Sequence, residues 1–89
     1  MTKRAEWRLR KLRVIRARDG DACCYCGKPM RFDPDDSQAP NVATVERIEP
    51  RGTPSSGRNE NLRLAHRKCN NETRGMAPAD KLAIMERLQ

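Results

Sequence analysis

The sequence is poor in aromatic residues. Aromatic side chains make up only 3% of the 89 residues, as single copies of Trp7, Tyr25 and Phe32. A chain of this length buries only about 60–70% of the surface that its unfolded form exposes, so its apolar core is thin. Chains of fewer than about 80 residues usually compensate with disulfides, a metal ion or oligomerisation. We therefore expect one domain, residues 1–89, that depends on a cross-link.

A membrane span and a secretory signal are also missing from the sequence. No stretch approaches about 18 consecutive apolar residues, which excludes a transmembrane helix, and the basic N-terminus lacks the apolar run of a signal peptide. We therefore expect a cytoplasmic protein in a reducing compartment. Close cysteine pairs in such a compartment bind metal more often than they form disulfides.

Acidic residues are too few to balance the basic ones. Nineteen Lys and Arg residues oppose twelve Asp and Glu, for a net charge of +7, and residues 1–18 hold eight basic side chains and one acid, Glu6. This indicates a polyanionic partner, and the shortage of bulky apolar side chains favours nucleic acid over a membrane. The alternative is a merely solvated basic face. The expected DNA contacts, mostly to phosphates, are Arg8, Arg10, Lys11, Arg13, Arg16, Arg67 and Lys68.

The N-terminal segment has the pattern of an amphipathic helix. Residues 2–18 contain no Gly or Pro, and Gly20 follows at a natural C-cap position. The apolar stripe is narrow, so one edge is expected to pack on the domain while Arg and Lys face solvent or phosphates. The stripe comprises Ala5, Leu9, Leu12 and either Ile15 or Arg16.

Two short strands are expected in the middle of the chain. Residues 42–48 are rich in β-branched side chains, and residues 61–65 alternate between polar and apolar. Loops rich in polar residues, Gly and Pro are expected over 32–41 and 51–60.

Two further helices complete an α+β fold. A short helix is expected over 66–74, and a C-terminal helix over 80–88 has Pro78 in its first turn. The apolar face of the last helix would form an interface with a protein partner, and it comprises Leu82, Met85 and Leu88.

Two pairs of candidate metal ligands share the same internal spacing. Cys23 and Cys26 lie three residues apart beside Gly27, and His66 and Cys69 repeat this spacing forty residues after Cys26. Three thiolates and one imidazole satisfy tetrahedral Zn²⁺, and four protein ligands leave no open position for water. The sequence therefore predicts a structural zinc site. The alternative is a set of buried free cysteines with a lone surface histidine.

Cys24 is the ambiguous cysteine. It would compete with Cys23, but Cys24 and Cys26 lie two residues apart, where an extended turn points side chains to opposite sides. We interpret Cys24 as a packing residue or a spare thiol. His66 is the single histidine of the chain, so zinc binding leaves no histidine as a base.

Three segments around these ligands carry a resemblance to a known family. Residues 44–51 read TVERIEPR, residues 59–65 read NENLRLA, and residues 66–70 read HRKCN. Together with the cysteine pair they resemble the zinc-containing HNH endonucleases of the ββα-metal type. The resemblance spans about residues 13–75, roughly two-thirds of the chain, and implies a hairpin with a helix packed over it.

The resemblance also implies a division of the chain into three parts. A basic helix would occupy residues 1–18, a zinc-bound ββα core residues 19–75, and a C-terminal helix residues 76–89. This is the HNH-like arrangement with flanking N- and C-terminal helices.

Catalytic residues follow from the same resemblance. In the family, an acidic residue on the first strand binds a catalytic divalent metal and the next residue, a histidine, deprotonates the attacking water. These positions match Glu46 and Arg47. The middle asparagine, which orients that histidine, matches Asn61, and the closing metal ligand matches Asn70. A catalytic Mg²⁺ or Mn²⁺ would therefore bind Glu46 and Asn70.

Arg47 departs from the family pattern, because a guanidinium stays protonated and cannot accept a proton from water. Three interpretations are open. In the first, Arg47 clamps the scissile phosphate while a metal-bound water or Glu49 takes over the proton. In the second, it pairs with Glu46 and mimics the metal in a binding module. In the third, the strand is shifted and Arg47 is a surface residue.

The leading expectation is an HNH-type DNA endonuclease or nicking enzyme from a bacterial or phage-infected cell. It would be dependent on a divalent metal and contain a structural zinc. The alternative is a catalytically impaired HNH-like zinc domain that binds DNA or a protein partner without cleavage. A third class is a zinc-ribbon-like assembly factor that uses the C-terminal helix as an interface.

Overall fold

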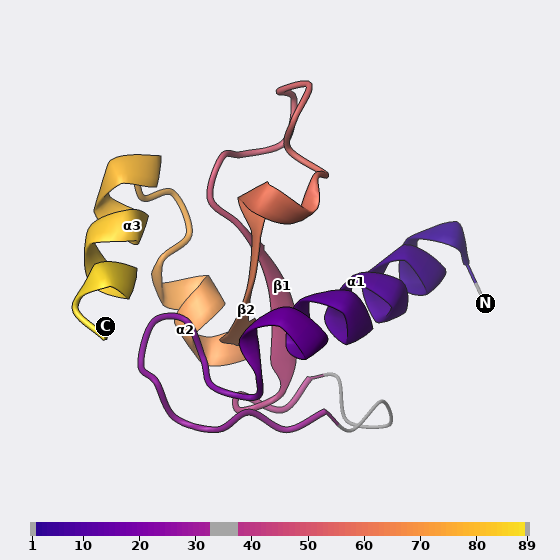
Figure 1. Cartoon of the computed structure of the whole chain (residues 1–89), viewed down its shortest axis with the longest axis horizontal. Helices are drawn as coiled ribbons and strands as arrows, with labels where there is room; N and C mark the ends of the chain where they lie inside the picture. Colours follow the sequence, from indigo (N-terminus) through magenta and orange to yellow (C-terminus); the bar gives the residue numbers. More distant parts are fainter. Residues whose placement is uncertain (1, 33–37, 89) are drawn as a thin grey trace.

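The computed structural model describes residues 2–32 and 38–88 and has a small α+β fold (Figure 1). The described part contains three α-helices, a short 3₁₀ helix and one two-stranded antiparallel sheet. The prediction of an α+β fold is therefore confirmed. The elements are α1 (Lys3–Asp19), β1 (Ala43–Arg47), η2 (Asn59–Asn61), β2 (Leu62–His66), α2 (Arg67–Glu72) and α3 (Pro78–Glu86).

The predicted helices and strands all occur, with small shifts at their ends. The C-terminal helix begins at Pro78 itself, because proline has no N–H to lose in a first turn. The short η2 was not predicted, since three residues are too few to show a periodicity. Of the loop expected over 32–41, residues 33–37 lie outside the described residues. Among those described, no helix combines the length and apolar character needed to cross a bilayer.

Helix α1 has defined caps at both ends. The Thr2 hydroxyl accepts a hydrogen bond from the Ala5 N–H at 3.1 Å, and Gly20, at φ 85°, donates its N–H to the Arg16 carbonyl. The positive φ suits glycine, which has no Cβ to clash. Figure 1 shows the N-terminal end of α1 projecting beyond the rest of the molecule.

The buried edge of α1 differs in part from the predicted stripe. Ile15 is fully buried, and Leu12 and Trp7 pack against the core, whereas Leu9 is 37% exposed. Leu9 follows Trp7 by two residues, about 200° around the helix, so the two side chains cannot share a face. Trp7 therefore takes the place that the pattern gave to Leu9.

The hairpin separates its side chains onto two faces. β1 and β2 pair antiparallel, with Glu46 opposite Arg63 and Arg47 opposite Leu62. Because successive strand residues point to opposite faces, Glu46 and Arg47 face different sides. Glu46 contacts Thr73, which follows α2, and Arg47 stacks on Trp7 of α1.

Helix α3 packs through a different face from the one predicted. Met85 and Lys81 are buried, whereas Leu82 and Leu88 are 37% and 49% exposed. The apolar face proposed as a protein interface is therefore divided, because Met85 belongs to the core. Figure 1 shows α3 next to α2 and on the other side of the hairpin from α1.

Candidate metal centre and the adjoining β1–α2 site

The first pair of candidate metal ligands lies in a tight turn. The Cys23 N–H donates to the Lys28 carbonyl, and the Gly27 N–H donates to the Cys23 carbonyl, both at 2.9 Å. Gly27 has φ 77°, a conformation that side-chain-bearing residues rarely adopt. This turn directs Cys23 and Cys26 toward the end of β2, where His66 is located.

The four predicted zinc ligands come together. The side-chain ligand atoms of Cys23, Cys26, His66 and Cys69 all lie within 4.8 Å of one another. The Nδ1 atom of His66 is 3.2 Å from the Cys26 sulfur and 3.8 Å from the Cys69 sulfur. Four donors at these separations surround a space of the size that tetrahedral Zn²⁺ occupies.

The opposite ring nitrogen of His66 fixes the ligand orientation. Nε2 lies 2.9 Å from the carbonyl oxygen of Pro29, and a carbonyl accepts, so Nε2 carries the proton. In the neutral ring, Nδ1 then presents its lone pair to the three sulfurs. A backbone carbonyl that orients a histidine in this way is typical of zinc sites.

The electrostatics of the thiols also fit a cation. Burial raises the pKa of Cys23, but the backbone N–H groups of His66, Cys26 and Tyr25 outweigh it and lower the pKa to about 7. Burial, followed by the neighbouring Cys23 thiol, raises the pKa of Cys69 to about 12. Ionisation of one thiol therefore disfavours ionisation of the next. A divalent cation bound between them would allow all three thiols to ionise.

Cys24 lies outside the ligand cluster, as interpreted from its spacing. It packs against the apolar core, and its N–H donates to the Leu64 carbonyl of β2 at 2.9 Å. Burial, and then the Cys23 thiol, raise the pKa of Cys24 above its ordinary value, so the thiol stays protonated. Cys24 is a packing residue.

Glu46, the predicted catalytic metal ligand, is buried and fully engaged. Its Oε2 atom accepts a hydrogen bond from the Tyr25 hydroxyl at 2.6 Å and lies 3.3 Å from the Thr73 hydroxyl. Its Oε1 atom is 3.5 Å from the ammonium of Lys81, which also donates to the Arg47 carbonyl at 3.0 Å. The carboxylate and the carbonyl together hold a cation, and that cation is a side chain of α3.

The hydroxyl of Tyr25 remains a donor to Glu46. Burial, and then the carboxylate of Glu46, raise the pKa of Tyr25 above its usual range. Three of these partners were missed by sequence reasoning, because their spacing to Glu46 follows no local motif. They are Tyr25, Thr73 and Lys81.

Asn70 reaches the same face of β1. Its side-chain amide donates to the Thr44 hydroxyl at 3.0 Å and to the Val45 carbonyl at 3.4 Å. The amide oxygen makes no hydrogen bond within the described residues, so it remains available as an oxygen ligand. The two residues expected to bind a catalytic metal, Glu46 and Asn70, thus both lie at the β1–α2 interface.

Arg47 lies on the opposite face of the hairpin. Its guanidinium carbon is 4.9 Å from the centre of the Trp7 ring, and Glu46 forms its ion pair with Lys81. The interpretation that Arg47 pairs with Glu46 is therefore wrong. A histidine at position 47 would also face α1, so it would not restore a base beside Glu46.

Asn61 braces the loop between the strands. Its side-chain oxygen accepts the Glu49 N–H at 2.7 Å, and its amide nitrogen donates to the carbonyls of Glu49 and Ser56 at 3.0 and 2.9 Å. The family's asparagine that matches Asn61 orients a histidine, whereas the Asn61 side chain hydrogen-bonds to backbone groups only. This is the turn-holding role that a buried asparagine performs well.

We expect Asn61→Ala to destabilise the domain by about 1–3 kcal/mol, because it removes three partly buried hydrogen bonds to the backbone. Urea unfolding with zinc in excess measures this loss. Asn61→Asp keeps the acceptor for the Glu49 N–H and removes the donors to Glu49 and Ser56, so it should cost less than Asn61→Ala. Equal stability of wild type and Asn61→Ala would contradict the bracing role.

The basic residues expected to bind DNA do not form one face. Arg16 is tied to Asp21 at 2.6 Å, and Lys11 donates to Asn59 at 2.7 Å. Lys68 lies 4.0 Å from Glu72 in an exposed pair. Of the remaining residues, Arg8, Arg10 and Arg13 are exposed and Arg67 is half-buried. The N-terminal helix therefore offers arginines on more than one side.

Comparisons with known proteins found no match. No family model, no curated protein and no solved structure matches this chain.

Proposed function

We propose that this chain is an HNH-type DNA endonuclease or nicking enzyme, with a structural zinc and a divalent-metal site at the β1–α2 interface. One observation carries the proposal. A cation, the Lys81 ammonium, is bound between the Glu46 carboxylate and the Arg47 carbonyl, on the face of β1 that Asn70 also contacts. Mg²⁺ and Mn²⁺ are bound by oxygen ligands such as carboxylates, carbonyl groups and water.

The residues of this site have separate parts in the proposed reaction. Glu46 and Asn70 would hold the divalent ion, which supplies charge stabilisation and activates water when bound. Tyr25 orients the carboxylate through its Oε2 atom, and the Thr73 hydroxyl, which is closer to the Cys69 carbonyl at 3.0 Å, contacts the same atom. Lys81 must leave Oε1 before an ion can bind there, so the lysine side chain has to move away.

A second candidate is a zinc domain that binds DNA without cutting it. The observation that favours it is the saturation of Glu46, whose two oxygens already face two hydroxyls and an ammonium. The chain's single histidine, His66, also belongs to the zinc set, so the site has no histidine base. Both candidates share the excess of positive charge.

Nicking of supercoiled plasmid with and without Mg²⁺ or Mn²⁺ separates the two candidates. We expect Glu46→Gln and Asn70→Ala each to lower divalent-dependent nicking by at least about a hundredfold, because a metal ion supplies several kcal/mol to the transition state. Glu86→Gln is the matched control, since it removes an exposed carboxylate of α3 that has no part in the proposed site and should leave nicking unchanged.

Lys81→Met tests the release of Glu46. If the ammonium competes with the divalent ion, the variant should nick at lower metal concentration than wild type, provided that its far-UV spectrum is unchanged. Absence of cleavage by wild type and by Lys81→Met on duplex, nicked and branched DNA, with DNA binding intact, would establish the non-cleaving candidate instead.

A further inference from the structure

A groove between α1 and β1 contains arginines on the side of the hairpin away from Glu46. The groove has a volume of about 380 Å³. We call it the α1–β1 groove, and the residues that matter to its chemistry are Arg4, Trp7, Arg8, Arg47 and Arg51. Helical geometry explains why two of the arginines come from α1. Arg4 and Arg8 are one turn apart, so they point the same way from the end of α1 that projects beyond the hairpin (Figure 1).

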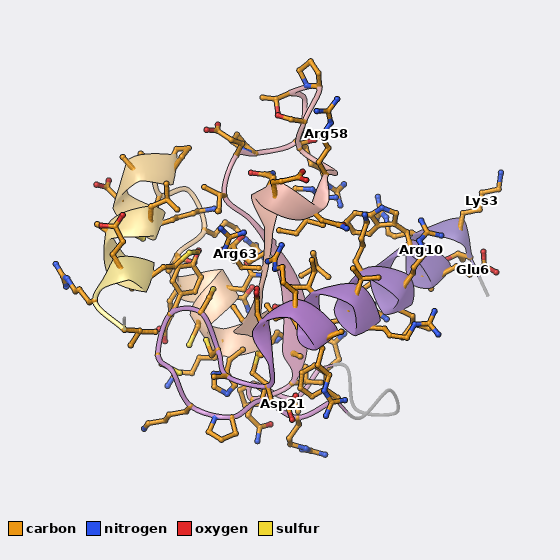
Figure 2. The ribbon with its side chains drawn as sticks, viewed as in Figure 1. Lys3, Glu6, Arg10, Asp21, Arg58 and Arg63 are labelled. Carbon is orange, nitrogen blue, oxygen red and sulfur yellow. The ribbon has the colours of Figure 1, made fainter. Side chains whose placement is uncertain are left out.

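Acidic side chains do not line this groove. Within the described residues, none of its four arginines forms an ion pair, whereas Arg16 and Arg18 bind Asp21 and Asp19 at 2.6 Å. Glu6, the single acid of residues 1–18, lies with Lys3 at the free end of α1 in Figure 2 and does not line the groove. The groove thus carries an excess of positive charge with no carboxylate in its lining, and the Glu46 carboxylate offsets the charge of Arg47 only in part.

The clustering of positive charge affects Arg47 most directly. Burial, and then the nearby Arg51 and Arg4, lower the pKa of Arg47 below its ordinary value. Its Nε atom is buried and has no hydrogen-bond partner among the described residues, and the guanidinium stacks on Trp7. A buried charged donor without a hydrogen-bond partner is unfavourable. An anion in the groove would screen the repulsion between Arg47 and the neighbouring Arg4 and Arg51.

We infer that the α1–β1 groove binds backbone phosphates of nucleic acid, at a place separate from the Glu46–Asn70 site. Arginines recognise phosphate oxygens through paired N–H donors. A membrane is disfavoured because Trp7 is the one large apolar side chain in the lining of the groove. The inference rests on the DNA-binding part of the proposed function and does not require cleavage.

Trp7 provides a direct probe of this groove, because it is the only tryptophan in the chain and carries Arg47 on its ring. We expect inorganic pyrophosphate and a short duplex DNA of mixed sequence each to change Trp7 fluorescence. The duplex should act at the lower concentration, and each should compete with the other. If pyrophosphate changes the emission but duplex DNA neither changes it nor competes, the groove binds free phosphate and the inference is overturned.

A matched pair of double variants tests the location. Arg4→Ala with Arg8→Ala removes two groove charges, and Arg10→Ala with Arg13→Ala removes two exposed charges of the same helix that do not line the groove. The groove variant should bind the duplex about tenfold more weakly and lower the slope of log K against log salt by about two, with the Trp7 response lost. The control variant should keep the Trp7 response and lose less affinity.

The outcomes separate this inference from the proposed function. Equal losses of affinity in the two double variants, or a saturated duplex complex with unchanged Trp7 emission, would overturn the groove assignment alone. Absence of DNA binding by wild type would overturn the proposed function as well. Binding of wild type to anionic phosphatidylserine vesicles but not to the duplex would identify a lipid surface and also overturn the inference.

Discussion

Chelation of the bound metal is expected to abolish the cooperative fold of this domain. The four ligands join the turn at Cys23 and Cys26 to the end of β2 and to α2. The core that remains is small: among the described residues, the largest side chains with less than 2% exposure are Ile15, Leu62 and Cys23. Apparent zinc-binding energies in small domains are about 10–16 kcal/mol, which a core of this size cannot replace.

The measurement is far-UV circular dichroism and thermal unfolding before and after addition of a chelator. Cys26→Ser should reproduce the unfolded spectrum without chelator, because it removes one ligand of the set. Cys24→Ala is the matched control: it removes a cysteine two residues away that lies outside the set, so the variant should still bind one zinc and unfold cooperatively. A metal-free wild type that keeps its spectrum and its thermal transition would contradict the structural role of zinc.

The four candidate metal ligands were predictable from sequence because local geometry brings each pair together. Two cysteines three residues apart beside Gly27 can adopt only a few turns, and most of these bring both sulfurs to one side. His66 and Cys69 have the same spacing at the junction of β2 and α2. The position of Gly20 at the end of α1 was predictable for a similar reason, since it needs only the adjacent residues.

The environment of Glu46 and Arg47 was not predictable in the same way. The alternation of a strand requires neighbours to face opposite sides, but the sequence does not say which helix covers which side. Trp7 was available to pair with Arg47 only once α1 was known to lie on that face. Lys81 reaches Glu46 because α3 packs with Lys81 and Met85 inward, and a lysine inside an apolar stripe is not a normal core residue.

Removal of Lys81 is expected to destabilise the domain strongly, because it leaves the Glu46 carboxylate buried without a counter-ion. The side chains of Lys81 and Glu46 are only 10% and 6% exposed. Loss of one partner of a buried ion pair costs about 3–5 kcal/mol, and the hydroxyls of Tyr25 and Thr73 supply no charge. Lys81→Met, which keeps much of the side-chain volume, should therefore unfold at clearly lower urea concentration than wild type.

The pair of single variants and the double variant measure how much of this loss is the interaction itself. Glu46→Gln removes the charge that Lys81 faces, and Glu46→Gln with Lys81→Met removes both charges, so the double variant should lose less stability than the two single losses added together.

Lys68→Met is the matched control, because its pair with Glu72 is 4.0 Å long and the two side chains are 70% and 62% exposed. Exposed pairs of this kind contribute below about 0.5 kcal/mol. If Lys81→Met costs no more than Lys68→Met, or if the single losses simply add, Glu46 does not depend on Lys81. The carboxylate would then be free to exchange that ammonium for a divalent ion with little change in stability.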